Sequence, residues 1–154
     1  MKKLLVTAAL GGGVGGLLDC LYATILWGFI LGHNPAGIWQ SVASGLLGKA
    51  SYDGGSATVL LGLALHFFIA FLMALVYVLA SRRLPALTAR PVLMGVLYGL
   101  VLYLVMNFVV VPLSAIGPRF PTSIKSVVLP LLPHILFVGP AIALITARRS
   151  RTTA

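Results

Sequence analysis

Acidic and thiol side chains are almost absent from this sequence. Its 154 residues include two Asp, no Glu and one Cys. Because Cys20 has no second cysteine to join, an internal disulfide is excluded, as are metal and redox motifs that need two thiols. The two carboxylates, Asp19 and Asp53, do not form the local carboxylate pair that a general acid–base motif would require.

Charge of either sign is scarce. Only 8% of the residues are Asp, Glu, Lys or Arg, whereas about a quarter are charged in an average soluble domain. With 60% hydrophobic residues, a soluble fold would expose a large apolar surface to water and aggregate. The composition therefore predicts a membrane protein, and the length fits a single transmembrane domain over 1–154.

The basic residues are distributed as in a membrane protein. Eleven Lys and Arg against two Asp give a net charge of +9, and the basic residues form short clusters between apolar runs. A nucleic-acid-binding domain would instead line one folded face with them. We therefore expect the lipid bilayer as the partner of this chain and no nucleic acid.

Four apolar runs are long enough to cross a membrane as helices. They cover about 4–31, 57–80, 92–114 and 127–147. Each can span the roughly 30 Å hydrocarbon core, and open strands are excluded because lipid cannot satisfy unpaired backbone groups. The first run is far longer than the apolar region of a cleaved signal peptide. The expected fold is all-α, a polytopic membrane four-helix bundle.

Lysine and arginine are divided unequally between the two sides of this bundle. With the N-terminus inside, eight basic residues lie in the inner segments and three in the outer loops. The eight are Lys2, Lys3, Arg82, Arg83, Arg90, Arg148, Arg149 and Arg151, and the three are Lys49, Arg119 and Lys125. Because basic loops stay in the cytoplasm, the N- and C-termini are both predicted to be cytoplasmic.

The first outer loop predicts a short helix over about 35–48. Asn34 is a good N-cap and Pro35 suits the first helical position. Apolar residues then recur at helical spacing, with three polar residues opposite: Ile38, Trp39, Val42, Ala43, Leu46 and Leu47 against Gln40, Ser41 and Ser44. This pattern indicates a periplasmic interfacial helix with Trp39 at the level of the lipid headgroups. It serves either as a connector or as a lid over the bundle.

Each predicted span contains one strongly polar residue, and the four lie at one depth. They are Asp19, His66, Asn107 and His134. Counted from the nearest basic residue at the cytoplasmic boundary, each lies 14 to 17 residues along its span, or about 21 to 26 Å. Because intramembrane polar groups usually face a bundle interior or a cavity, we expect the four to meet inside the bundle.

Small residues share a helix face with three of these polar groups. Steps of four residues from Asp19, His66 and Asn107 reach glycines that we expect at close helix contacts: Gly11, Gly15, Gly62, Gly95 and Gly99. Gly95 and Gly99 form a GxxxG pattern, and we also expect the bundle to self-associate as a homo-oligomer. In the fourth span, Pro133 should free a backbone carbonyl near His134.

The polar residues allow several interpretations. They can simply hydrogen-bond across helices. As the only acid in a span, however, Asp19 should be protonated or paired, and His titrates near neutral pH. The favoured function is a small proton-linked transporter or permease-like protein. Alternatives are a non-catalytic accessory or assembly subunit, a metal-binding protein that uses Asp19, His66 and His134, and a haem-binding protein with the two histidines as axial ligands.

The sequence requires no cofactor, and it leaves open whether a metal is bound. It contains no motif of an enzyme active site, so we expect no enzymatic activity. The GGGVGG run lies inside an apolar span and does not follow a strand, which excludes a nucleotide-binding fingerprint.

Two stretches also carry a family resemblance: SVASGLLGKASYDGGSATVLLGLALHFFIAFLMALVYVLASRRLPAL and PVLMGVLYGLVLYLVMNFVVVPLSA. Over roughly residues 35–145 the chain resembles a family of small bacterial inner-membrane proteins whose activity is unassigned. More distantly it is similar to YagU-like inner-membrane proteins, although it is shorter and lacks their polar tail. The resemblance implies the inner-membrane topology and, through the acid tolerance associated with YagU, a proton-linked role. It implies no catalytic or binding residues.

Overall fold

A computed structural model describes residues 1–119 and 122–151 of the chain, and all regular structure in these residues is helical. Four helices are long and apolar enough to span a membrane: Lys2–Ile30, Gly55–Ser81, Pro91–Leu113 and Ile124–Arg151. The predicted all-α, four-span fold is therefore confirmed. The ends differ from the prediction by four residues or fewer, because capping groups and basic ends extend the helices beyond their apolar runs. At Ile124, for example, the Ser123 side chain caps the helix.

Three of the four spans change helical geometry along their length. The first is α1 (Lys2–Ala23) followed by η1 (Thr24–Ile30), and the second is the uninterrupted α3 (Gly55–Ser81). The third comprises α5 (Pro91–Val105), η3 (Met106–Val110) and α6 (Val111–Leu113), and the fourth α7 (Ile124–Pro133), η4 (His134–Val138) and α8 (Gly139–Arg151). The segments η1, η3 and η4 are π-helical.

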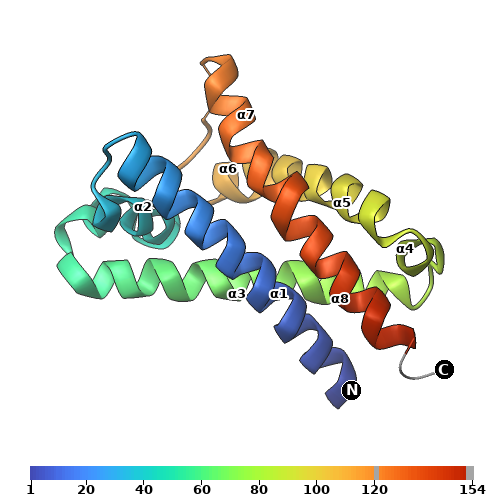
Figure 1. Cartoon of the computed structure of the whole chain (residues 1–154). Helices are drawn as coiled ribbons and strands as arrows, with labels where there is room; N and C mark the ends of the chain where they lie inside the picture. The colour runs from blue at the N-terminus through green and yellow to red at the C-terminus, as the bar shows by residue number, and fades with distance from the viewer. Residues whose placement is uncertain (120–121, 152–154) are drawn as a thin grey trace.

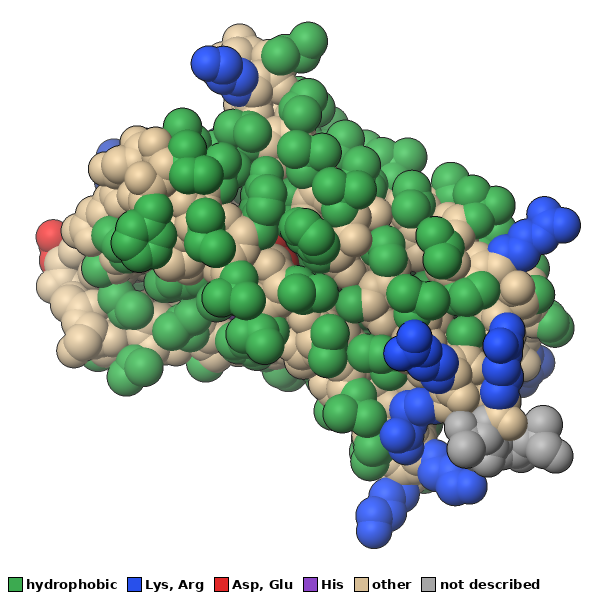
Figure 2. Space-filling view, in the orientation of Figure 1, with side chains coloured by type: hydrophobic (Ala, Val, Ile, Leu, Met, Phe, Trp, Pro, Cys, Tyr) green, Lys and Arg blue, Asp and Glu red, His purple; other side chains and the backbone are tan. Residues whose placement is uncertain are grey.

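The bundle is built from two contacting helix pairs. Helix α1 packs on α3, α8 packs on α5, and α1 and α8 lie side by side in the middle with opposite directions (Figure 1). Both chain termini are at one end, together with α4 (Ala86–Ala89) in the loop between α3 and α5. Lys and Arg side chains gather at this same end (Figure 2), which we call the basic end.

Close backbone contacts at glycine hold these pairs together. A Cβ atom added at Gly12 would lie 2.6 Å from the Ala70 carbonyl oxygen of α3, and one at Gly95 would lie 2.6 Å from Pro140 Cα of α8. The predicted packing residues Gly11, Gly15, Gly95 and Gly99 are all buried at contacts between spans. Gly62 is buried too, but the backbone that it contacts is that of Trp39, outside the spans.

The predicted outer helix exists as α2 (Pro35–Leu47), with the Asn34 side chain accepting from Ala36 N at 3.0 Å. The facing of this helix differs in part from the predicted pattern. Trp39 is 7% exposed and packs against His66, the polar Gln40 and Ser44 are buried beside it, and Leu46 is 62% exposed. Gln40 is buried, and its side-chain amide donates to Tyr52 O before α3 and to Gly55 O and Thr58 Oγ1 at the start of α3. These hydrogen bonds determine which face of α2 is buried.

The apolar core lies toward the basic end. It includes Tyr77, Ile142 and small residues such as Ala74, all nearly inaccessible to solvent. The hydroxyl of Tyr98 in α5 donates to Met73 O of α3 at 2.7 Å, and the rings of Tyr98 and Tyr77 are 4.8 Å apart. These contacts join α3 and α5 in this half of the bundle. The two helices are farther apart toward the other end (Figure 1), where the polar residues lie.

The glycine contacts predict opposite effects of alanine at two positions. A Cβ at Gly99 would collide with the His134 carbonyl group and lie 2.8 Å from Ile135 Cα, whereas nothing lies within 4 Å of a Cβ at Gly13. We expect Gly99→Ala to destabilise the fold by about 1 to 3 kcal/mol through overpacking. Gly13→Ala should be neutral or stabilising by up to about 1 kcal/mol, because Ala favours helices. Thermal unfolding of both variants in the same detergent measures this. Equal melting temperatures would contradict the packing.

Candidate functional site

The four polar residues predicted to meet do line one cavity. It has a volume of about 250 Å³ and lies between the spans at the level of η3 and η4. Its polar walls are Asp19 from α1, His66 from α3, Asn107 from η3 and His134 from η4. The remaining walls are small or apolar: Gly16, Val42, Ile69, Ala70, Met73, Met106, Val111 and Val138. We call this space the central cavity.

His66 is held by the backbone of the neighbouring span. Its Nε2 lies 2.8 Å from the carbonyl oxygen of Gly16, and its ring contacts those of Trp39 and Phe67 edge-on at 5.4 and 5.2 Å between centroids. A carbonyl oxygen can only accept, so Nε2 must carry the hydrogen. In the neutral imidazole, Nδ1 is then an acceptor.

The remaining nitrogen of His66 faces the carboxyl group of Asp19. Nδ1 and Asp19 Oδ2 are 3.9 Å apart, and the two side chains are only 14% and 21% exposed. This distance is longer than a hydrogen bond. The two groups are nevertheless near enough to attract each other electrostatically when the imidazole carries a charge and the carboxyl group is ionised.

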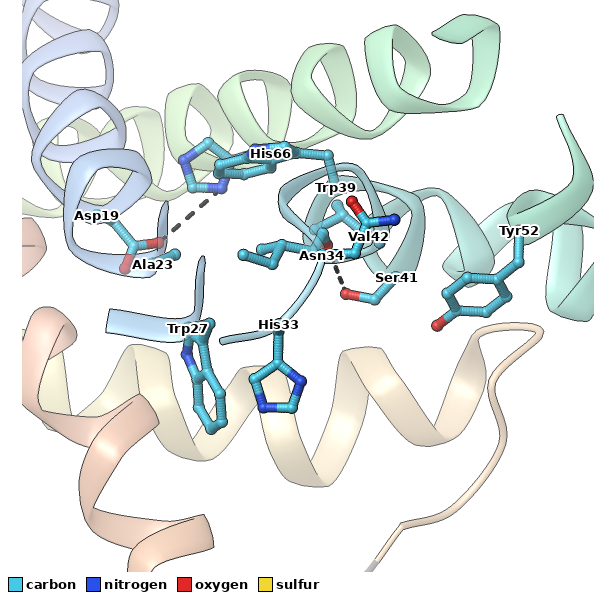
Figure 3. Close-up of a pocket in the computed structure, with 12 residues that line it drawn as sticks. Asp19, Ala23, Trp27, His33, Asn34, Trp39, Ser41, Val42, Tyr52 and His66 are labelled. Carbon is cyan, nitrogen blue, oxygen red and sulfur yellow. Dashed lines mark hydrogen bonds and ion pairs between the residues drawn. The ribbon is translucent and has the colours of Figure 1, made fainter. Parts of the chain in front are cut away.

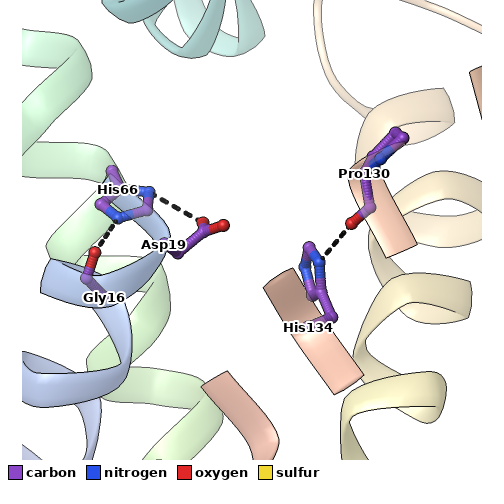
Figure 4. A network of polar contacts seen from close by, with 5 residues as sticks. All are labelled: Gly16, Asp19, His66, Pro130 and His134. Carbon is purple, nitrogen blue, oxygen red and sulfur yellow. Dashed lines mark hydrogen bonds and ion pairs between the residues drawn. The ribbon is translucent and has the colours of Figure 1, made fainter. Parts of the chain in front are cut away.

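His134 faces the same carboxyl group from the opposite wall. Its Nδ1 lies 2.8 Å from the Pro130 carbonyl oxygen, so Nδ1 donates and Nε2 is the acceptor of the neutral ring. Asp19 interacts electrostatically with both imidazoles, and its carboxyl group points into the space between them (Figure 4). The carboxyl group of Asp19 is thus within electrostatic range of both histidines.

Pro133 has the expected effect on the fourth span. Because proline has no N–H, the Leu129 carbonyl cannot make its helical hydrogen bond, and the hydroxyl of Tyr22 donates to it at 2.9 Å. This bond ties α1 to α7 one turn beyond Asp19. The freed carbonyl predicted near His134 is therefore confirmed.

Asn107, like His134, is bonded within its own span. Its Nδ2 donates to Tyr103 O at 2.9 Å. It lies in a π-helical segment, as His134 does. Such segments are frequent at functional sites because the extra residue in the turn re-aims side chains and loosens backbone hydrogen bonds.

A second cavity adjoins the first on the side of α2. It has a volume of about 520 Å³, and Asp19, Val42 and His66 line both. Figure 3 shows Asp19 and His66 on one side of this outer cavity, with Trp27 and His33 on another. Asn34, Ser41 and Tyr52 add polar groups toward the connection to α3. The outer cavity therefore extends from the loop after η1 to the Asp19–His66 pair.

The three-ligand metal site that the sequence allowed is not formed. In residues 1–119 and 122–151, no group of three or more His, Cys, Asp or Glu side chains is close enough to hold one ion. His66 and His134 are each turned toward a backbone carbonyl by one nitrogen, and they approach Asp19 from opposite walls.

Sequence reasoning missed several wall residues. Trp39 and Val42 were predicted only as apolar positions of an interfacial helix, yet Trp39 packs on His66 and Val42 lies between the two cavities. His33 lies in the loop after η1, outside the predicted spans. A usable signal was the polar face of 35–48, since buried Gln40 and Ser44 required hydrogen-bond partners inside the protein.

The sequence matches no protein-family model and no curated protein, and no solved structure matches the fold. The function therefore has to be inferred from the two cavities and their polar walls.

The carbonyl contacts predict different tautomers for the two neutral imidazoles. His66 should carry its hydrogen on Nε2 and His134 on Nδ1, which is the rarer form in solution. Solid-state NMR of ¹⁵N-histidine-labelled protein in bilayers measures this, with His66→Gln and His134→Gln assigning the signals. Exposed His33 serves as the internal reference. An Nε2–H tautomer at His134 would contradict the hydrogen bond to Pro130.

Proposed function

We propose that this chain is a small proton-linked transporter or permease-like protein in which Asp19 and His66 bind the coupling proton. The observation that carries the proposal is the pairing of the only acid in a span with an imidazole whose other nitrogen is fixed by a backbone carbonyl. Such a pair changes charge when it gains or loses one proton. A charge change inside a low-dielectric bundle can alter helix packing or ligand affinity.

His134 and Asn107 complete the proposed site. His134 offers an alternative partner for the Asp19 carboxyl group across the central cavity, so the proton can be held on either side. Asn107 offers a neutral polar group that can hydrogen-bond a solute. The mostly apolar walls suit a small solute with few polar groups.

The outer cavity supports an access route for that solute. It borders the Asp19–His66 pair through walls shared with the central cavity, and α2 covers them on one side. Val42 of α2 lies at the boundary between the two. In this proposal α2 acts as the lid, and its movement away from α3 joins the two cavities.

We further propose that the protein lies in a bacterial inner membrane with both termini in the cytoplasm. Two features support this topology: the basic end carries both termini, and positively charged segments stay on the cytoplasmic side. The resemblance to small inner-membrane proteins agrees with this, and the distant YagU-like similarity favours a proton-linked role. Enzymatic activity is not part of the proposal.

The proton-binding pair predicts that Asp19 is required for proton movement. Proteoliposomes loaded with pyranine and given a potassium diffusion potential with valinomycin should take up protons faster than empty liposomes. Asp19→Asn should reduce the protein-dependent rate by about tenfold or more, because an amide cannot carry the proton. Asp53→Asn removes the same charge at an exposed position outside both cavities, and it should retain the wild-type rate.

Two results of this experiment would contradict the proposal. One is a wild-type rate equal to that of empty liposomes, and the other is an unchanged rate in Asp19→Asn. Either result, together with co-purification of one defined partner in detergent, would favour the accessory-subunit interpretation. A Soret band or bound metal in the purified protein would favour the haem or metal interpretation. Oligomeric state is measured on the same sample.

The topology predicts one-sided thiol labelling. In a Cys20→Ser background, Ser41→Cys lies on the wall of the outer cavity, and Ala86→Cys lies exposed in α4 at the basic end. A membrane-impermeant maleimide should label Ser41→Cys in intact bacterial cells and Ala86→Cys only after permeabilisation. The reverse pattern would invert the proposed orientation.

A further inference from the structure

The basic end contains a cavity that neither the proton site nor the access route uses. It has a volume of about 300 Å³ and lies where α1, α3 and α8 converge. Three basic residues line it: Lys3 of α1, Arg82 directly after the end of α3, and Arg149 of α8. The cavity lies at the opposite end of the spans from the proton site, so its ligand is independent of the proposed transport.

Hydroxyl groups form the inner wall of this cavity. Thr7 and Thr146 are buried at 7% and 4% exposure, and Ser81 lies beside Arg82 at the end of α3. Arg149 donates through Nε to Thr7 Oγ1 at 3.0 Å, which fixes its side chain across the interface of α8 and α1. The three basic side chains thus border a cavity in which the position of Arg149 is already fixed.

Both aspartates of the chain lie away from this cavity. Asp19 lies deep in the first span and Asp53 precedes α3 at the far end. Positive-inside anchoring explains why Lys and Arg are frequent at this end. It does not explain why Lys3, Arg82 and Arg149 border one cavity with buried hydroxyls, while Arg83 and Arg90 lie outside it.

We propose that this cavity binds a phosphate group, supplied by the headgroup of an anionic phospholipid or by a soluble phosphate compound. Guanidinium groups bind phosphate oxygens in a bidentate manner, and lysine adds a point charge. The hydroxyl groups of Thr7, Ser81 and Thr146 already donate to backbone carbonyls of their own helices, so they form only the polar wall of the cavity. The position favours the lipid, because basic cavities between spans at the cytoplasmic boundary suit lipid headgroups. Leu4 and Val78 in the wall provide contacts for the adjoining glycerol and acyl chains.

Native mass spectrometry of the full chain tests the lipid source. The protein in detergent is incubated with phosphatidylglycerol or, as a zwitterionic comparison, phosphatidylcholine. We expect phosphatidylglycerol to be retained, and its affinity to fall about fivefold in Lys3→Gln and in Arg82→Gln, the loss expected for one cation near an anionic lipid. Arg90→Gln removes the same charge at the same end but outside the cavity, and it should bind as the wild type does. Both cavity substitutions are at exposed side chains, so folding is retained and is checked by melting temperature.

Inorganic phosphate tests the soluble source on the same variants. If it raises the melting temperature of the wild type more than chloride of equal ionic strength, and Arg82→Gln loses this effect, the ligand is a soluble phosphate compound. Retention of phosphatidylglycerol without a phosphate response identifies the lipid. A failure of both ligands to bind would overturn the proposal, as would an equal loss of binding in Arg90→Gln and Arg82→Gln. Proton uptake in the Asp19 variants is measured separately and does not affect this outcome.

Discussion

Hydrogen bonds from side chains to backbone carbonyls are the interaction on which the interior of this protein depends. Lipid offers no partner to a polar group, so each donor inside a span must find an acceptor within the protein. His66, His134 and Asn107 all donate to backbone carbonyl groups, and so does Tyr22. Each such bond fixes which polar atom remains to face the central cavity. The chemistry of the proposed site follows from this choice of partners.

The close helix contacts at glycine also determine where the central cavity lies. The glycines at 12 and 16 let α1 approach α3, and Gly95, Gly99 and Gly139 let α5 approach α8 and η4. These close pairs leave α3 and α5 joined mainly near Tyr98, in the half of the bundle toward the basic end. Within the described residues, no glycine of α3 or α5 contacts the other of these two helices. The four polar side chains line the space that remains between them.

The two ends of the bundle differ in charge and in the ligands that they suit. The central and outer cavities contain one acid, imidazoles and an amide, groups that exchange protons and hydrogen-bond neutral solutes. The cavity at the basic end contains Lys, Arg and hydroxyl groups, which suit a phosphate anion. The apolar core around Ile142 and Ala74 separates the sites.

The sequence by itself determined the four spans, the common depth of the polar residues and most of the glycine contacts. These follow from local properties, namely apolar run length, 1.5 Å rise per residue and four-residue spacing. Only the tertiary structure decided which face of α2 is buried, because Gln40 is buried through hydrogen bonds to carbonyls 12 to 15 residues farther along the chain. It also decided how Asp19, His66 and His134 are paired. The π-helical turns at η3 and η4 shift side chains off the regular helical face, and no sequence period records that shift.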